Sequence, residues 1–267
     1  MRTLVKKVMN AMQVHTVLEL ELGSSMGLLL RLAAHEERLA AIRGKEQLAL
    51  PVSSSESFFD VLGNPVSRLT LGAGVHQIDY RLTAQPGVEL TLKPLLPFSP
   101  IQELPQDTLL FLQPSRYVDS DRLGTIAFEV LAGASTGGEQ VLTLFDWVRK
   151  TLPYTPGMSA RPLSASEVLK QAHGVCRDLA HVLIGMVRAI SIPARYVVGY
   201  VQGLDPQDIH AWVEVFVGGR WYVLDPTYSE PGALRAPVMH GRDAADVAIM
   251  DQFGPLPIRS EMSVNVW

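Results

Sequence analysis

The sequence contains a single cysteine, no long apolar run and no excess of basic residues. One cysteine cannot form a disulfide within the chain, and secreted proteins of this size more often carry such bridges, so we expect a reducing, cytoplasmic setting. No stretch reaches the roughly 18 uncharged apolar residues that a membrane-spanning helix needs. Polar residues such as Glu19 and Glu21 also interrupt the region where a signal peptide would need an unbroken apolar segment. The sequence therefore predicts neither a signal peptide nor a passage through a membrane.

The charge balance argues against two classes of partner. The chain has 23 Lys and Arg residues against 27 Asp and Glu residues, which gives a formal net charge of −4. Such a chain has no overall attraction for the phosphates of nucleic acids or for anionic lipid surfaces. With 47% hydrophobic residues, a chain of 267 residues can bury one large core or two smaller ones. We expect a globular protein whose partners are neither nucleic acids nor membranes.

The first hundred residues have the pattern of short strands separated by turns. Apolar residues alternate or cluster in four stretches bounded by turn residues: 15–21, 27–32, 77–84 and 88–95. Strands at this spacing are typical of a sandwich or a barrel, and we expect an N-terminal antiparallel β-sandwich module over residues 1–100. Prolines at 94, 97, 100, 105 and 114 disfavour long regular structure in the segment that follows. Residues 101–118 are therefore predicted to form a linker.

Beyond residue 118 the hydrophobic pattern changes to that of helices followed by strands. Residues 125–132 and 139–152 are predicted to be helical, and Ser164 and Glu167 have the spacing of a capping box that opens a short helix. The clearest helix begins near Cys176, because apolar residues recur on one face at positions 179, 182, 183, 186, 187 and 190. Strands are expected at 194–201, 209–217 and 221–225. The pattern predicts a second domain, of mixed helices and strands, over residues 119–267.

Cys176 lies in the first turn of the clearest helix, where two interpretations compete. It continues the apolar stripe three residues before Leu179, and free cysteines are among the most often buried residues, which favours a structural role. The unpaired amides and the dipole at a helix N-terminus, however, stabilise a thiolate, which is the nucleophilic form of cysteine. The catalytic interpretation requires a base nearby.

His210 is the candidate base, and the pattern of its strand places an acid beside it. The odd-numbered residues of 209–217 are all apolar, so the strand is expected to be half-buried, with His210 on its less apolar face. A two-residue turn at 218–219 would pair the strand with the next one so that Trp212 faces Asp225. His210 and Asp225 would then be diagonal neighbours, about 7 to 8 Å apart between backbones, within reach of an imidazole and a carboxylate.

A thiol, an imidazole and a carboxylate are the groups that nucleophilic thiol catalysis requires. The base takes the proton of the thiol, and the acid fixes the orientation and tautomer of the base. Each residue alone has a commoner structural role: Asp225 precedes a proline as turn-forming aspartates do, and most histidines are surface or satisfied core residues. The catalytic hypothesis depends on the coincidence of Cys176, His210 and Asp225 within one continuous stretch.

Four segments of the chain resemble the transglutaminase-like superfamily of cysteine acyl-transfer enzymes. They are 174–181 (GVCRDLAH), 191–200 (SIPARYVVGY), 210–212 (HAW) and 225–227 (DPT). The resemblance is greatest to bacterial members described as candidate cysteine proteases, and it implies that Cys176 is the nucleophile, His210 the base and Asp225 the orienting acid. An N-terminal β-rich domain, a Ser-Arg-Tyr segment at 115–117 and a closing stretch at 241–248 also match in order. Ser191 departs from the pattern, because a glycine is usual at its position.

The resemblance further implies a papain-like, transglutaminase-like core in which a helix packs on an antiparallel sheet, and a reaction without a cofactor. We expect cysteine-dependent acyl transfer or hydrolysis of a peptide or carboxamide substrate through a thioester. Because the sequence shows neither a calcium site nor a secretion signal, protease or amidase activity is favoured. The alternatives are a cross-linking transglutaminase and a non-catalytic binding or scaffolding protein that retains the fold.

Further candidates surround the three main residues. The backbone amide of Cys176 is a candidate donor to an oxyanion, with Gln171 as a candidate second donor. Trp212 is a candidate lining residue of a substrate groove, although packing within the hairpin is the commoner role for such an aromatic. Cys176 and His181 are five residues apart on a helix and therefore face different directions, so we expect no metal site.

Overall fold

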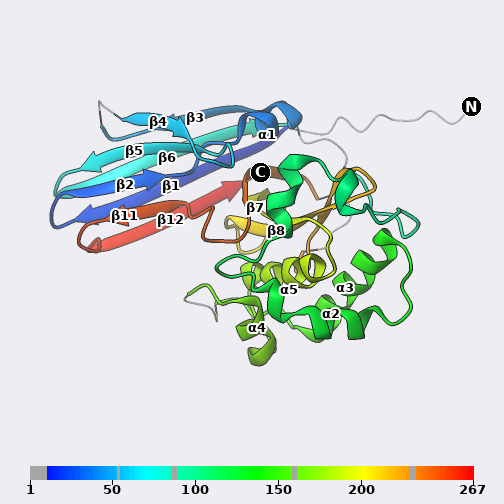
Figure 1. Cartoon of the computed structure of the whole chain (residues 1–267). Helices are drawn as coiled ribbons and strands as arrows, with labels where there is room; N and C mark the ends of the chain where they lie inside the picture. Colours follow the sequence, from blue (N-terminus) through cyan, green and yellow to red (C-terminus); the bar gives the residue numbers. More distant parts are fainter. Residues whose placement is uncertain (1–10, 53–54, 86–88, 158–160, 229–232) are drawn as a thin grey trace, which may run out of the picture.

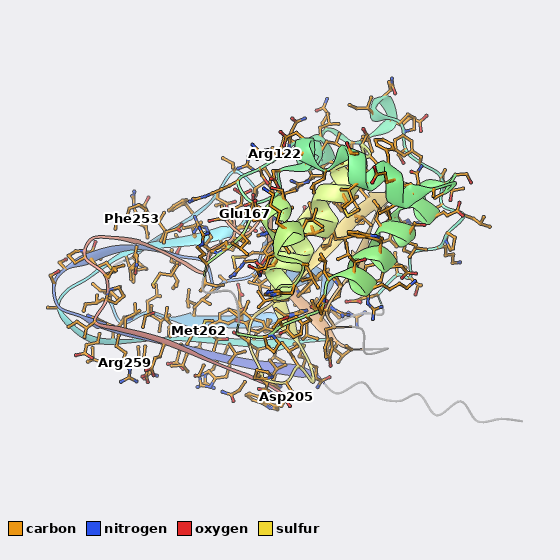
Figure 2. The ribbon with its side chains drawn as sticks, turned by 90° about the horizontal axis from the view of Figure 1, so that it is seen from below. Arg122, Glu167, Asp205, Phe253, Arg259 and Met262 are labelled. Atoms are coloured by element: carbon orange, nitrogen blue, oxygen red, sulfur yellow. The ribbon has the colours of Figure 1, made fainter. Side chains whose placement is uncertain are left out.

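The computed structural model of the chain describes residues 11–52, 55–85, 89–157, 161–228 and 233–267. The chain forms two halves, one made mainly of strands and one of helices packed on a further sheet, and one large hydrophobic cluster extends through both (Figure 1). Figure 2 shows Phe253 and Arg259 on the strand-rich half, and Arg122 and Glu167 on the helical half. Among the described residues, no helix combines the length and the apolar character needed to span a bilayer.

The strand-rich half contains two four-stranded antiparallel sheets, with the strand orders β12-β1-β6-β3 and β11-β2-β5-β4. Along β1 every second residue is buried, as expected for a strand in a sheet that is covered on one face only. The predicted β-sandwich module is confirmed. Its elements are β1 (Met12–Leu22), β2 (Met26–Leu30), α1 (Glu36–Ala41), β3 (Lys45–Ala49), β4 (Glu56–Phe59), β5 (Pro65–Leu71), β6 (Gly74–Ala84), β11 (Met250–Phe253) and β12 (Arg259–Val266).

The last two strands return to the sheets formed by the first residues of the chain. β12 pairs with β1, from Val14 opposite Val266 to Glu21 opposite Arg259, and β11 pairs with β2. Residues 250–266, which the sequence analysis groups with the core, therefore complete the N-terminal sheets (orange and red beside blue in Figure 1). The pattern could not reveal this pairing, because most side chains of β12 are exposed and its apolar alternation is weak.

The helical half is built on a four-stranded antiparallel sheet with the order β10-β7-β8-β9. α5 packs on β7 and β8, and α2, α3 and α4 cover α5 from outside. Each helix and strand expected between residues 125 and 225 is present, which confirms a helix packed on an antiparallel sheet. The elements are α2 (Gly124–Leu131), α3 (Gly137–Thr151), α4 (Ala165–Gln171), α5 (Cys176–Ala189), β7 (Ala194–Val201), β8 (His210–Val217), β9 (Arg220–Leu224) and β10 (Arg235–Gly241).

The segment between the two halves packs against the protein, unlike a flexible linker. Residues 89–95, expected to form a strand with Val88, contain none, and Val88 itself lies outside the described residues. Residues 101–118 contain two 3₁₀ helices, η1 (Ile101–Glu103) and η2 (Gln106–Leu112), which is the short regular structure that the prolines allow. Phe111 of η2 meets the ring of Trp221 edge-on, with 5.7 Å between centroids. The segment predicted to be a linker thus covers the sheet of the helical half.

β8 is buried on both faces, whereas the alternation predicts a half-buried strand. α5 covers one face, as expected. On the other face, Trp212 packs against Val197 and Val201, and Glu214 forms an ion pair with Arg38 of α1. Charged residues can be buried on this face because they form ion pairs there. The alternation of apolar residues in the sequence does not reveal such pairs.

Candidate active site

α5 begins at Cys176, as the sequence pattern predicts, and the turn before it is fixed by a buried carboxylate. The amide of Val175 donates to Asp178 Oδ2 at 3.2 Å, and Asp178 is fully buried. A Cβ on Gly174 would lie 2.7 Å from the Cβ of Asp178, so only glycine allows this close approach. Cys176 is partly exposed at the start of the helix, where the first amides have no partner within the helix.

The β8–β9 hairpin brings His210 and Asp225 together. The turn residues Gly218 and Gly219 have φ values of 57° and 80°, the left-handed conformation that a two-residue type I′ turn needs. The strands pair from Val217 opposite Arg220 onward, in the register that the sequence predicts. At the far end of the hairpin, Nε2 of His210 lies 2.8 Å from Oδ2 of Asp225.

Asp225 makes hydrogen bonds with both of its carboxylate oxygens. Oδ1 accepts from the amide of Thr227 at 3.0 Å, from the hydroxyl of Thr227 at 3.0 Å and from the amide of Tyr228 at 2.9 Å. Oδ2 accepts from His210 and also from Nη2 of Arg235 at 3.2 Å. Burial alone would raise the pKa of Asp225, but the bond and charge of His210 and its other partners lower it. Asp225 therefore shapes the turn and holds the imidazole at the same time.

His210 is the charged partner in this arrangement. Burial opposes its charged form, but hydrogen bonds to Asp225 and Cys176, and the charges of those two groups, raise the pKa of His210 to about 9. Its Nε2 faces Asp225, which leaves Nδ1 as the ring nitrogen available on the side of Cys176. At neutral pH the site thus holds an imidazolium beside a sulfur, the arrangement that stabilises a thiolate.

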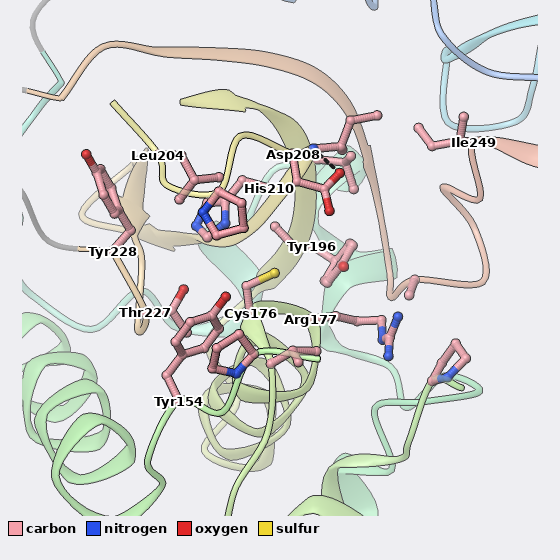
Figure 3. Close-up of a pocket in the computed structure, with 18 of the residues that line it drawn as sticks. Tyr154, Cys176, Arg177, Tyr196, Leu204, Asp208, His210, Thr227, Tyr228 and Ile249 are labelled. Carbon is pink, nitrogen blue, oxygen red and sulfur yellow. Dashed lines mark hydrogen bonds between the residues drawn. The ribbon is translucent and has the colours of Figure 1, made fainter. Parts of the chain in front are cut away.

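Cys176 and His210 both line a cavity of about 590 Å³ (Figure 3). Its walls are mainly apolar and aromatic, with Leu204, Ile209 and residues 247–249 among them. Arg177 contributes a positive charge to the lining, and Asp205 and Asp208 contribute negative charges. A cavity of this size, mainly apolar with a few polar groups, is within the usual range for ligand-binding sites.

Two tyrosines of the cavity were not identified from the sequence. Tyr154 is placed by a bridge between its backbone and that of Gly174, immediately before α5. Tyr196 of β7 is 3% exposed and lines the cavity, and among the described residues its hydroxyl has no hydrogen-bond partner. Burial, followed by the nearby Cys176, raises the pKa of Tyr196 well above its usual value, so its hydroxyl keeps its proton. The segment 191–200 was singled out in the sequence, but nothing in it indicates where this hydroxyl points.

Two residues proposed from the sequence lie away from the cavity. Gln171 is exposed, and its side-chain amide donates to the carbonyl of His173 at 3.1 Å, so it is not placed as a second oxyanion donor. Trp212 is 1% exposed and packs within the sheet rather than lining a groove. Both expectations are corrected for the same reason: the position of a residue in the chain does not fix the direction of its side chain. Over the described ranges, no group of three His, Cys, Asp or Glu side chains is arranged to hold a metal ion.

Comparison with known proteins agrees with this geometry. Residues 124–226 match the family model of the transglutaminase-like superfamily, a range that contains Cys176, His210 and Asp225. This part of the chain is transglutaminase-like. The crystal structure of a candidate cysteine protease from Cytophaga hutchinsonii superposes on the chain with a TM-score of 0.82 and 28% identity, covering 97% of this chain and 91% of that one. The strand-rich half is therefore shared as well.

Two mycobacterial proteins match shorter parts of the chain. An uncharacterized protein of Mycobacterium leprae is 32% identical over 146 residues, which is 51% of this chain and 52% of that protein. An uncharacterized protein of Mycobacterium bovis is 35% identical over 111 residues, 35% of each chain. The matched region thus spans about half, or less, of the length of these relatives.

Proposed function

We propose that this protein is a cysteine-dependent hydrolase of peptide or carboxamide bonds that acts through a thioester on Cys176. The observation that carries the proposal is that Cys176 and His210 line the same cavity, while His210 is bonded behind it to Asp225 at 2.8 Å. In this arrangement each group has the partner that thiol catalysis requires: a nucleophile, a base that it contacts, and an acid that orients the base.

In the first half of the reaction, the thiolate of Cys176 attacks the carbonyl carbon of the substrate and a carbon–sulfur bond forms. The carbon–nitrogen bond then breaks as His210 gives its proton to the leaving amine. Because the pKa of His210 is raised to about 9, His210 keeps that proton at neutral pH and can donate it. The product of this half is a thioester and a free amine.

In the second half, water attacks the thioester while His210 accepts one of its protons. The carbon–sulfur bond breaks, the acid leaves, and the sulfur and imidazole return to their starting state. An amine in place of water would give a new amide, which is the cross-linking alternative.

The negative oxygen that forms in both halves needs hydrogen-bond donors. The amide of Cys176 is one, because it lies in the first turn of α5. The protonated hydroxyl of Tyr196 is our candidate for the second donor, in the role first considered for Gln171. Its support is its burial in the cavity wall and the absence of another partner among the described residues.

The decisive experiment is to trap the thioester. The protein is mixed with a library of peptides and simple carboxamides, quenched in acid, and analysed for acyl adducts on Cys176 by mass spectrometry, with His210→Ala as a variant. The expected result is an acyl adduct on Cys176 that forms and is then lost as water hydrolyses the thioester. Conversion of the acyl group into a methylamide when methylamine is added would favour cross-linking. Absence of any adduct, together with equally slow alkylation of Cys176 by iodoacetamide in both proteins, would contradict the proposal and favour a scaffold.

A further inference from the structure

Besides His210 and the turn residues Thr227 and Tyr228, Asp225 has a charged partner, Arg235. Arg235, at the start of β10, is 9% exposed and directs Nη2 to Asp225 Oδ2 at 3.2 Å and to the carbonyl of Tyr228 at 3.0 Å. Its Nη1 donates to Glu89 Oε2 at 3.0 Å. The oxygen of Asp225 that holds the imidazole is thus also held by a guanidinium.

The guanidinium has little freedom in this position. It is planar, and its fork of donors reaches Asp225 and Glu89 with different nitrogens, while its Nε has no partner among the described residues. Its orientation is therefore set by these two carboxylates and by the carbonyl of Tyr228. A lysine could keep the charge but not this geometry.

Glu89 connects the site to the segment that leaves the strand-rich half. It follows β6 in the chain, whereas Arg235 lies 146 residues later. Burial raises the pKa of Glu89, and the charge and hydrogen bond of Arg235 oppose that change. A neutral residue at position 235 would leave Glu89 without this partner, whereas a neutral residue at position 89 would leave Arg235 with Asp225 as its remaining carboxylate.

We propose that Arg235 is a positioning residue that holds Asp225 against His210 and sets the charge felt by the imidazole, and that Glu89 in turn holds Arg235. The inference rests on the proposed function, because it assigns a role beside the same three residues. It also gives the segment after β6 a part in the site, since the series of contacts runs from Cys176 to Glu89.

The charge on Arg235 predicts the direction of its effect. A positive charge beside Asp225 weakens the attraction between that carboxylate and the imidazolium, so its removal should raise the pKa of His210. Removal of the negative charge of Glu89 should act in the opposite direction. The other titratable or charged groups around the pair stay unchanged in both variants: Cys176 of α5, Tyr154 after α3, Asp208 before β8 and Tyr228 after β9.

The test is the titration of His210 by NMR in protein labelled with ¹⁵N-histidine, with Arg235→Met, Arg235→Lys and Glu89→Gln as variants. We expect the midpoint of His210 to rise by about 0.5 to 1 pH unit in Arg235→Met, to change less in Arg235→Lys, and to fall in Glu89→Gln. Arg195→Lys is the matched control, because Arg195 is a buried arginine of the same sheet that pairs with Glu214 and should leave the midpoint unchanged.

The outcomes separate this inference from the proposed function. If the wild-type protein forms no acyl adduct, the proposed function fails whatever the titrations show. If it does form one, but the midpoints of the folded Arg235→Lys and Glu89→Gln proteins coincide with the wild type, Arg235 has no positioning role. Should Arg235→Met not fold, these two milder variants still decide the question.

Discussion

Two clusters of charged side chains lie on the same face of β8 but differ in their access to the cavity. The site cluster consists of His210, Asp225, Arg235 and Glu89, and the sealed cluster consists of Glu214, Arg38, Arg195 and His240. The site cluster has two carboxylates, one arginine and one histidine, whereas the sealed cluster has one carboxylate, two arginines and one histidine. Each joins one of the first ninety residues to the sheet of the helical half. Only the site cluster borders the cavity that contains Cys176.

The two histidines show how neighbours decide the charge of the same side chain. His210 bonds to a carboxylate, and its pKa rises to about 9. His240 accepts a hydrogen bond from Nε of Arg38 at 3.3 Å. Burial first, and then the charges of Arg38 and Arg195, hold the pKa of His240 far below its usual value. The first histidine is thus held in its charged form, whereas the second is held neutral.

The largest expected effect comes from removing the charged histidine. His210→Ala should lower kcat/KM by about 10² to 10⁴-fold, because proton transfer to the leaving amine is lost. His240→Asn, which removes the neutral histidine of the sealed cluster, should leave kcat/KM of the folded protein near the wild-type value. The measurement is turnover of a substrate found by the trapping experiment. Similar losses in both variants would erase the distinction between the clusters.

The sealed cluster should matter for stability instead. Arg38 donates to both oxygens of Glu214 at 3.1 Å each, while Arg195 donates to Oε2 at 2.7 Å. Arg38→Met should lower the free energy of unfolding by about 3 kcal/mol, the lower end for a broken buried ion pair, because Arg195 remains. The double variant Arg38→Met, Glu214→Gln should lose more stability than Arg38→Met, because it also leaves Arg195 without its counter-charge. Urea denaturation measures both; an unaltered midpoint for Arg38→Met would show that the cluster adds no stability.

Tyr196 tests whether the open cavity, rather than burial alone, gives a polar group a catalytic role. Tyr196→Phe should lower kcat by about 10² to 10³-fold with little change in KM, as when an oxyanion donor is removed. Tyr200→Phe is the matched control, because Tyr200 is also a buried tyrosine of β7 but bonds to the hydroxyl of Thr16 at 2.9 Å. A kcat for Tyr196→Phe equal to that of the control would exclude the hydroxyl as a donor.

The clusters should also respond to opposite ends of the pH range. Above about pH 9 His210 loses the proton that the leaving amine needs, so kcat/KM should fall there. The pKa of Glu214 is held well below its usual 4.5, because the charges of Arg38 and Arg195 outweigh burial. A carboxyl with a depressed pKa stabilises the fold above its unfolded pKa, and this contribution is lost as the pH falls below about 4.5. Glu214→Gln should therefore flatten the acid side of a stability profile without moving the alkaline fall in kcat/KM.

The parts of the site that the sequence could predict are the local ones. The Gly218-Gly219 turn sets the register of β8 and β9, and a two-residue turn leaves no freedom for a shift, so the approach of His210 to Asp225 follows from counting. The start of α5 at Cys176 follows from the apolar stripe. These features depend on residues that are neighbours in the chain.

The parts that could not be predicted depend on distant pairing. Arg235 and Glu89 meet across 146 residues, and β12 pairs with β1 across nearly the whole chain. Buried ion pairs such as that of Glu214 look, in sequence, like residues of a solvent-exposed face. Tyr196 lies within the motif at 191–200, but its place in the cavity wall depends on the packing of β7 on α5.

The smallest expected effect lies outside both clusters, at the end of α5. Ser191 has φ of 64°, and the amides of Ser191 and Ile192 donate to the carbonyls of Arg188 and Val187 at 2.9 and 3.2 Å. This is a Schellman motif with serine at the position where glycine is preferred. Ser191→Gly should raise the free energy of unfolding by about 1 kcal/mol, because glycine adopts this conformation without a Cβ clash. Ser191→Ala keeps the Cβ and should not reproduce the gain, and neither variant should alter kcat/KM, since no residue of either cluster is touched.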